Sequence, residues 1–177
     1  MKNGFTLIEL VIVIGILAIL ATVVVLVLNP AQLLAQARDS QRMSDLGSVK
    51  SAIALYLATA NSPAVGATSK GTVSTVCWFG TNCVTACSGV SSSTLVDSTG
   101  WVNVNLNGTT GGSPLSALPL DPSQTGIYQY AYIGDAGNLT FELNANLEST
   151  KYSGLEGSDG GNCTTTYEVG TAPGLSL

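Results

Sequence analysis

The sequence contains no histidine, and this absence limits the chemistry that the chain can perform. Serine–histidine–aspartate and cysteine–histidine nucleophiles both depend on an imidazole base, so neither can form. Metal sites with histidine ligands are excluded for the same reason. The sequence also shows no clustered pair of carboxylates with plausibly perturbed pKa values, which catalysis by two acids would need. We therefore expect a protein that is not an enzyme and that carries no organic cofactor.

Basic residues are scarce as well. The chain has six lysines and arginines against eleven acidic residues, which gives a formal net charge of -5. Beyond residue 60 the sequence contains just two basic residues, Lys70 and Lys151. A nucleic-acid-binding surface requires a basic patch that neutralises phosphates. The charge distribution therefore argues against nucleic acid as a partner.

One continuous apolar segment, residues 5–28, holds much of the hydrophobic content of the chain. It is interrupted only by Thr6, Glu9, Gly15 and Thr22, and it is long enough to cross a bilayer as a helix. A secretory signal peptide would have a shorter apolar region and a small-residue cleavage site after it. Lys2 on the leading side favours a cytoplasmic amino terminus. We expect a single-pass protein of the cytoplasmic membrane whose remaining chain is exported.

Glu9 is the one acidic residue inside this apolar segment, where an unpaired charge is costly. No lysine, arginine or histidine occurs between Lys2 and Arg38 to neutralise it. Cleavage between Gly4 and Phe5 would create an amino group that could do so. That amine could belong to the same helix, four residues away, or to a neighbouring chain. The alternative is an ordinary anchor in which Glu9 reaches water near the cytoplasmic interface.

The amino-terminal sequence GFTLIELVIVIGILAILA resembles the signature of bacterial type IV prepilins and type II secretion pseudopilins. The resemblance implies a leader of residues 1–4, which a prepilin peptidase removes by cutting after Gly4. It also implies methylation of the new amino group of Phe5. Glu9 would then meet the terminal amine of a neighbouring subunit as an inner-membrane assembly platform builds a helical homo-oligomeric filament. The finished filament, or fimbrium, would be extracellular or periplasmic, with residues 5–28 in its core.

Residues 29–60 are predicted to form an amphipathic continuation of the helix. Asn29-Pro30 favours a kink or a restart, and Asn61-Ser62-Pro63 marks the end. Apolar residues recur at helical spacing to form one stripe toward a packed domain: Leu46, Val49, Ile53, Tyr56 and Ala60. The charged residues are expected on a solvated or subunit-facing surface: Arg38, Asp39, Arg42, Asp45 and Lys50.

The four cysteines all lie in the polar remainder, residues 61–177, which we expect to be one exported head. Cys77, Cys83 and Cys87 fall within residues 61–100 and Cys163 lies far downstream. Even numbers of cysteines in an exported domain favour disulfides, here pinning a long loop over residues 61–100. Three pairings are open. A zinc site with four thiolates is the alternative, but the spacing lacks the paired short knuckles of zinc modules.

Residues 101–177 are predicted to hold the β-sheet and a carboxyl-terminal loop. Alternating apolar residues predict strands over 101–107, 127–133 and 139–145, the last two joined as an antiparallel hairpin by Gly134–Asn138. Tyr128, Tyr130 and Tyr132 share one face, and a packed tyrosine ladder is favoured over a ligand platform. Together these elements predict an α+β, pilin-like fold: a long helix packed on a small antiparallel sheet.

A second resemblance concerns the head. Leu118-Pro119-Leu120-Asp121-Pro122, with the strands and the Gly-rich loop that follow, is similar to the head of major pseudopilins. In calcium-binding members, ligands come from the loop after the sheet, which here is residues 153–162. The resemblance assigns Ca²⁺ to four residues there: Glu156, Ser158, Asp159 and Asn162. The alternative is a simple turn, since Gly, Ser and Asp are good turn residues.

Three functions are compatible with these features. The first is the structural subunit of a type IV pilus-like filament, the second the major pseudopilin of a type II secretion system. The third, from a different class, is an exported binding domain for which the apolar helix is only a tether. The long segment 61–100 suits a displayed surface and favours the pilus, whereas the likeness of the head favours the secretion system.

Overall fold

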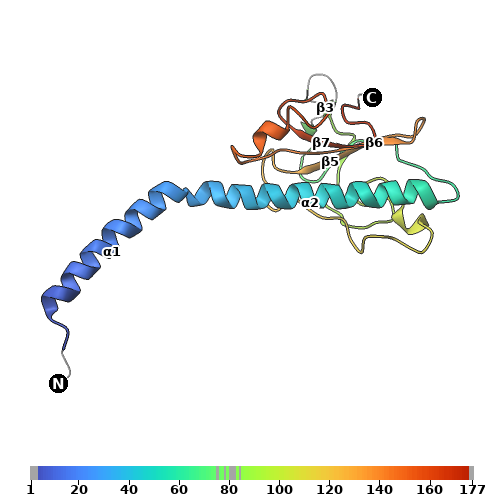
Figure 1. Cartoon of the computed structure of the whole chain (residues 1–177). Coiled ribbons are helices and arrows are strands. Elements are labelled where there is room, and N and C mark those ends of the chain that lie inside the picture. The colour runs from blue at the N-terminus through green and yellow to red at the C-terminus, as the bar shows by residue number, and fades with distance from the viewer. Residues whose placement is uncertain (1–3, 75, 78, 80–82, 84, 176–177) are drawn as a thin grey trace.

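The computed structural model describes residues 4–74, 76, 77, 79, 83 and 85–175. Two helices, α1 (Leu7–Leu28) and α2 (Pro30–Thr59), run one after the other and form a long, bent rod. Figure 1 shows the remaining chain gathered around α2, while α1 projects away alone. The molecule therefore has an elongated shape, with a globular head at one end and a bare apolar helix at the other.

The bend lies at Asn29, which caps both helices. Its backbone is left-handed, with φ 40° and ψ 77°, and Asn is one of the few residues that adopt this conformation readily. Pro30 cannot donate a backbone hydrogen bond, so the ladder of α1 cannot continue through it. The Asn29 side chain accepts a hydrogen bond from the Gln32 N–H at 3.4 Å and starts α2. The predicted kink at Asn29-Pro30 is confirmed.

The head contains a five-stranded sheet in the order β4-β1-β5-β6-β7. It consists of β1 (Lys70–Gly71), β4 (Gly89–Val90), β5 (Tyr130–Asp135), β6 (Thr140–Ala145) and β7 (Tyr167–Gly170). All pairs are antiparallel except β1 with β4. A separate ribbon pairs β2 (Val76–Cys77) with β3 (Thr85–Ala86), and two short 3₁₀ turns are η1 (Leu106–Gly108) and η2 (Ser153–Leu155).

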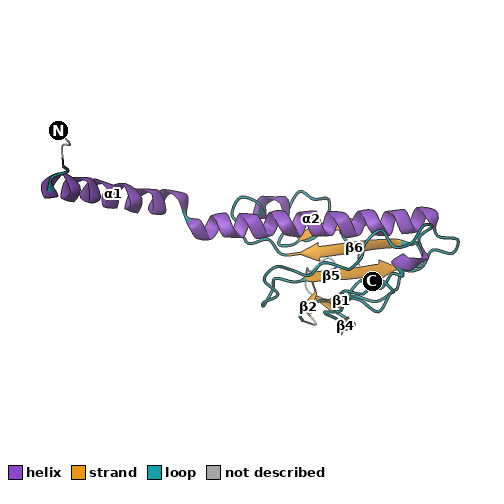
Figure 2. Ribbon diagram, turned by 90° about the horizontal axis from the view of Figure 1, so that it is seen from below, coloured by secondary structure: helices purple, strands orange, loops and turns teal. Residues whose placement is uncertain are grey.

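The main core lies between α2 and one face of the sheet, as Figure 2 shows from below. Four of the five residues predicted for the apolar stripe of α2 are buried there, and Ala60 packs against them. Tyr130 and Tyr132 of β5 face this core, and the Tyr130 ring lies 5.8 Å from the ring of Trp101. Tyr128 precedes the strand and is half-buried. Tyr130 and Tyr132 therefore pack within the core, whereas Tyr128 lies outside it. The predicted α+β arrangement of a long helix on a mostly antiparallel sheet is confirmed.

The opposite face of the sheet is also covered. Ala131 and Ile133 of β5 pack there with Cys77, Phe79 and Cys87, and Leu175 near the end of the chain lies against them. Residues 61–100 therefore do more than the predicted loop, because β1 and β4 extend the sheet and Phe79 fills this second, smaller core. The β7 edge strand was not predicted from the sequence.

The predicted strand over residues 101–107 is wrong, although its burial pattern is right. Val102, Val104 and Leu106 are buried as the alternation implied. Their backbone is irregular, however: the Leu106 N–H donates to the Val96 carbonyl at 2.8 Å and the chain then turns into η1. One isolated bridge, between Asp97 and Asn105, takes the place of a strand ladder. Alternating burial here comes from loops that pack under α2, not from a sheet.

The predicted hairpin is confirmed with shifted bounds. β5 and β6 pair from Tyr130 with Ala145 to Asp135 with Thr140, so residues 136–139 form the connection. The Asp135 side chain accepts hydrogen bonds from the N–H groups of Gly137 and Asn138, at 2.8 and 3.3 Å, and closes this turn. β5 therefore begins and ends later than the alternation alone indicated, whereas β6 begins one residue later and ends at residue 145 as predicted.

Candidate functional site

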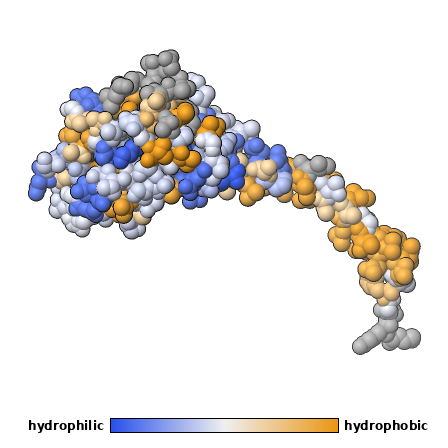
Figure 3. Space-filling model, turned by 180° about the vertical axis from the view of Figure 1, so that it is seen from behind, coloured by the Kyte–Doolittle hydropathy of each residue, from blue (hydrophilic) through white to orange (hydrophobic). Residues whose placement is uncertain are grey.

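The apolar surface of α1 is the most conspicuous feature outside the head. Figure 3 shows hydrophobic residues along the whole projecting helix, in contrast to the mixed surface of the head. The segment Leu7–Val25 is long and apolar enough to cross a membrane, and none of it is buried within the molecule. Large aliphatic side chains point outward all round it, such as Leu7, Ile19 and Val27. A helix that is apolar on every side requires lipid or other helices around it.

Glu9 lies in the first turn of this helix and is bonded to Thr6. Its Oε2 accepts hydrogen bonds from the Thr6 N–H at 2.9 Å and from the Thr6 hydroxyl at 2.7 Å. In return the Glu9 N–H donates to the Thr6 hydroxyl oxygen at 3.3 Å, which completes a capping box. Within a single chain, Glu9 is thus held at the very start of the helix, with its carboxylate turned back toward Thr6.

Gly4 and Phe5 precede the helix and are open to solvent. Phe5 is 78% exposed, and a side chain added at Gly4 would meet no atom within 4 Å. The peptide bond between them lies outside the helix, which begins at Leu7. A protease could therefore reach this bond without unwinding α1. The other three leader residues, 1–3, lie outside the described residues.

The predicted solvated surface of α2 is wrong for Asp39 and Arg42, both of which are fully buried. Arg42 Nε donates to Asp121 at 2.6 Å, its Nη1 donates to Asp39 at 2.8 Å, and its Nη2 reaches Glu148. Its guanidinium also lies 5.0 Å from the ring centre of Tyr128. We call these four ionic residues the Arg42 cluster. It joins α2 to two loops of the head.

The electrostatics of the Arg42 cluster follow from this geometry. Burial opposes the charge on Arg42, but hydrogen bonds to Asp121 and Glu148 outweigh it, so the pKa of the guanidinium stays raised. Arg38, a half-buried neighbour, adds hydrogen bonds to Glu148. Those bonds, with Arg42, lower the pKa of Glu148 from 4.5 to about 2. Of the other residues predicted on this surface, Asp45 accepts from the Tyr130 hydroxyl and Lys50 is exposed.

The four predicted disulfide cysteines form two disulfides, Cys77–Cys87 and Cys83–Cys163. Their Cα atoms lie 5.4 and 5.2 Å apart, within the usual range for disulfides. One closes a short loop at the edge of the second core, and the other ties that loop to the carboxyl-terminal segment. This pairing was one of three that the sequence left open, and it replaces the alternative of a zinc site with four thiolates.

The four residues assigned to calcium make hydrogen bonds within the protein. Glu156 is buried and accepts from the Leu147 N–H at 2.9 Å. Asp159 accepts from two backbone N–H groups, and Ser158 and Asn162 donate to backbone carbonyls. Among the residues that the structure describes, no group of three or more acidic, cysteine or histidine residues could hold a metal. The calcium site stays a prediction without support from this geometry.

Sequence reasoning missed three features that the structure reveals. Thr6 was read only as a break in the apolar segment, although Thr followed three residues later by Glu is the pattern of a capping box. The partners of Arg42 come from distant loops, so only its spacing to Asp39 could have been noticed. Glu142 and Glu168, on strands, are both fully buried. Nothing in their sequence surroundings distinguishes them from residues on a solvated strand face.

Comparison with known proteins places the amino terminus in a defined class. Residues 1–25 match the family model described as the prokaryotic N-terminal methylation motif. A search of curated proteins found no match, and a search of solved structures found none either. The matched segment includes Gly4, Phe5, Glu9 and most of the exposed apolar helix, and it implies processing by a prepilin peptidase. The chain therefore carries at residues 1–25 the type IV pilin and pseudopilin signature, that of a membrane-anchored, exported protein.

Proposed function

We propose that this chain is the structural subunit of a type IV pilus-like filament. The observation that carries the proposal is the combination of an exposed, all-round apolar helix with a cleavage and methylation motif at its free end. Before assembly, the subunit is anchored in the cytoplasmic membrane with its head exported. After cleavage between Gly4 and Phe5 and methylation of Phe5, α1 leaves the lipid and packs among the α1 helices of other copies. Its role is structural and not enzymatic.

Glu9 gives the assembly its register in this proposal. In the single chain its carboxylate bonds to Thr6, which satisfies backbone and hydroxyl groups but supplies no positive charge. Cleavage creates a positively charged amine at Phe5. When that amine comes from a neighbouring subunit, the two charges neutralise each other inside the helix bundle, where an unpaired carboxylate would be costly. A shift between subunits would break this pair, so the pairing selects one axial position.

Replacement of Glu9 tests the proposal directly. Glu9→Ala should leave prepilin cleavage and Phe5 methylation intact and stop polymerisation, as measured by mass spectrometry of the amino terminus and by electron microscopy of sheared filaments. Thr6→Ala is the matched control, because it weakens the capping box without removing the charge. We expect filaments from Thr6→Ala. Normal filaments from Glu9→Ala would refute the charge pairing.

The major pseudopilin of a type II secretion system is the second filament function. Its supporting segment, residues 118–122, has an internal role in this structure: Pro119 accepts from the Trp101 indole at 2.9 Å, and Asp121 belongs to the Arg42 cluster. A gene neighbourhood with an outer-membrane secretin and exported hydrolases would favour secretion. Filaments seen outside the cell at native expression would favour the pilus.

The tethered binding domain makes a different prediction for the amino terminus. A simple tether keeps Met1 and remains a dispersed monomer in the bilayer. A filament subunit begins with N-methylphenylalanine at position 5 and is recovered in sheared fractions. Mass spectrometry of the mature chain therefore separates the two functions before any filament is seen.

A further inference from the structure

The two disulfides of the head are interleaved along the sequence. Cys83 lies between Cys77 and Cys87, which are joined to each other, and it is itself joined to Cys163. The two disulfides span 10 and 80 residues. Three of the four cysteines thus lie in residues 77–87, which we call the three-cysteine segment, and the native pairing joins none of its nearest neighbours.

Chain statistics favour other pairs when the unfolded chain first meets an oxidant. The probability of contact between two residues falls roughly as the −3/2 power of the loop length. Cys77 and Cys83 are six positions apart, so their contact is favoured about fiftyfold over that of Cys83 with Cys163, 80 positions away. In a chain exported from its amino terminus, the three-cysteine segment also leaves the membrane before Cys163. Disulfide formation therefore begins with short pairs.

Both short non-native disulfides contain Cys83. One joins it to Cys77, and the other joins it to Cys87, four positions away. In each case the third cysteine of the segment remains a thiol. When its thiolate attacks the sulfur that is bonded to Cys83, the Cys77–Cys87 disulfide forms and Cys83 leaves as a thiolate. One disulfide bond breaks and one forms, so this exchange consumes neither an oxidant nor a reductant.

Packing gives the exchange its direction. Cys77 and Cys87 both belong to the second core, where they are 0% and 8% exposed. The β2–β3 register pairs Cys77 with Thr85, two residues before Cys87, and the Cα atoms of the two cysteines lie 5.4 Å apart. Folding of the second core therefore favours the disulfide between the two cysteines that it buries.

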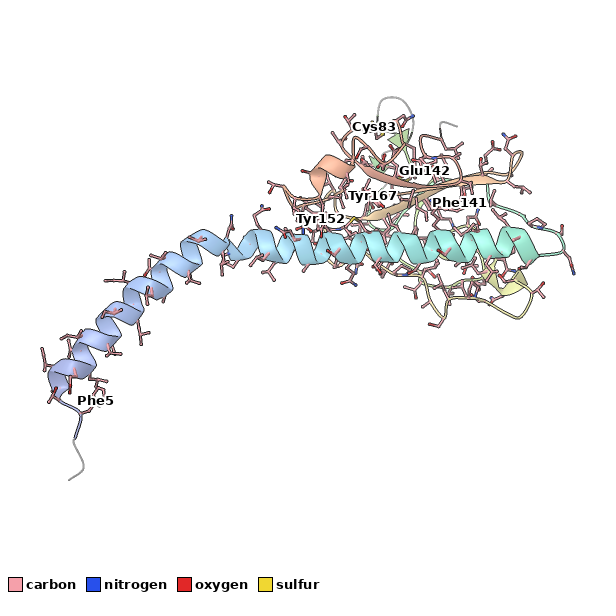
Figure 4. The ribbon with its side chains drawn as sticks, in the orientation of Figure 1. Phe5, Cys83, Phe141, Glu142, Tyr152 and Tyr167 are labelled. Atoms are coloured by element: carbon pink, nitrogen blue, oxygen red, sulfur yellow. A yellow bond between two sulfur atoms is a disulfide. The ribbon has the colours of Figure 1, made fainter. Side chains whose placement is uncertain are left out.

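Cys83 depends on a later part of the fold. It is half-buried, and its φ of 53° is a left-handed conformation that residues other than glycine adopt rarely. Figure 4 labels it on the side of the sheet opposite α2. Its partner Cys163 is 1% exposed and lies in the connection between β6 and β7, whose pairing positions that connection. The Cys83–Cys163 disulfide therefore needs a sheet that has already formed.

We infer that the three-cysteine segment sorts its own disulfides: exchange within it makes Cys77–Cys87 and releases Cys83, which is joined to Cys163 last. That last step is an oxidation, in which the two thiols lose two electrons and two protons to an oxidase whose reactive disulfide is reduced to a dithiol. Such an oxidase also makes the first disulfide, and no separate disulfide isomerase takes part. The inference concerns the head alone and goes beyond the proposed filament function.

The test starts from the reduced full chain in detergent micelles with concentrated urea. One equivalent of diamide, an oxidant that takes up two electrons and two protons and contributes no thiol, makes one disulfide per chain. The urea is then diluted at mildly alkaline pH with no thiol added. Samples taken over time are alkylated and digested with proteases that cut after Phe79 and Ala86, so that mass spectrometry identifies each pair.

We expect the short disulfides of Cys83 to predominate first. After dilution Cys77–Cys87 should replace them, with Cys83 and Cys163 both alkylated, and a second equivalent of diamide should then form Cys83–Cys163. Short pairs that persist until glutathione is added would show that exchange needs an external thiol, and the inference would fail. It would also fail if Cys83–Cys163 formed before Cys77–Cys87.

Two variants, each with three cysteines left, identify the attacking thiol. Cys163→Ser should sort at the wild-type rate and keep Cys83 as a thiol. In Cys87→Ser, only Cys163 is left to open a Cys77–Cys83 disulfide, through a loop of 80 residues instead of 10. We therefore expect that disulfide to disappear about twentyfold more slowly than in the wild type.

An unchanged rate in Cys87→Ser, or slow sorting in Cys163→Ser, would assign the attack to Cys163 and overturn the inference. The wild-type time course decides the question alone if either variant does not fold, because the order of the two native disulfides is read directly from it.

Discussion

Replacement of Arg42 by alanine should destabilise the head far more than any change on a solvated helix face. Arg42 is completely buried, and its guanidinium donates to Asp39, Asp121 and Glu148. Asp39 in turn accepts hydrogen bonds from the N–H groups of Glu148 and Ser149, at 2.9 and 2.8 Å. Loss of the cation would leave three carboxylates together, two of them fully buried. Arg38 bonds to Glu148, but it is half-buried and does not replace the buried charge of Arg42.

The size of the effect follows from how buried ion pairs behave. Removal of one partner from a buried pair costs about 3–5 kcal/mol, because the remaining charge is desolvated and unpaired. Typical domains have only about 5–15 kcal/mol of total stability. A chain of this size loses roughly 2–4 °C of Tm per kcal/mol. We therefore expect Arg42→Ala to lower the Tm by roughly 6–20 °C.

Thermal unfolding of the full chain in detergent micelles, followed by near-ultraviolet circular dichroism, measures this loss. Arg38→Ala is the matched control, because Arg38 binds the same Glu148 but its side chain is 36% exposed. Partly exposed pairs contribute about 0–1 kcal/mol, so its Tm should change little. Equal losses in the two variants, or an unchanged Tm in Arg42→Ala, would refute the claim that burial makes this cluster important.

Two further predictions concern pH and the disulfides. The free energy of unfolding should fall as the pH drops from the ordinary glutamate value of 4.5 toward 2, because ion pairing holds the pKa of Glu148 at about 2. Equilibrium urea unfolding across that pH range measures this fall, and Glu148→Gln should make it smaller. Removal of the Cys83–Cys163 disulfide, which spans 80 residues, should cost about 4.5 kcal/mol, against about 2.7 kcal/mol for Cys77–Cys87, which spans 10. Serine pairs at each position, compared by the same unfolding measurement, would contradict the loop-length argument if the order were reversed.

The sequence predicted best where a feature depends on nearby residues. The apolar segment and the break at Asn29-Pro30 follow from local chemistry, and so do the α2 stripe and the β5–β6 hairpin. Alternation at Val102 and Val104 correctly predicted that these side chains are buried, but it did not predict the backbone. A strand also needs a neighbouring strand to pair with. The backbone of Leu106 bonds instead to Val96 in a loop, and no local sequence pattern indicates this contact.

Long-range contacts account for what the sequence could not show. The sequence does not distinguish Arg42 from a surface arginine, because its partners Asp121 and Glu148 lie on loops 79 and 106 residues further along the chain. Glu142 cannot be distinguished by sequence from a solvent-facing strand residue, because the Leu175 N–H that bonds to its carboxylate comes from a segment 33 residues further along the chain. The disulfide pairing has the same origin, since four cysteines allow three pairings and only the folded chain brings Cys83 next to Cys163.

Asn29, the left-handed residue at the junction of the two helices, separates the lipid-facing segment α1 from α2, the helix that carries the head. No backbone hydrogen bond of the α1 ladder can pass through Pro30, and the head packs on α2 alone, so the dihedral angles of Asn29 determine the direction in which the head faces. A substitution there could reorient the outer surface while both the lipid-facing segment and the core keep their contacts. The surface that a finished polymer presents to its surroundings thus depends on two torsions as well as on the residues displayed.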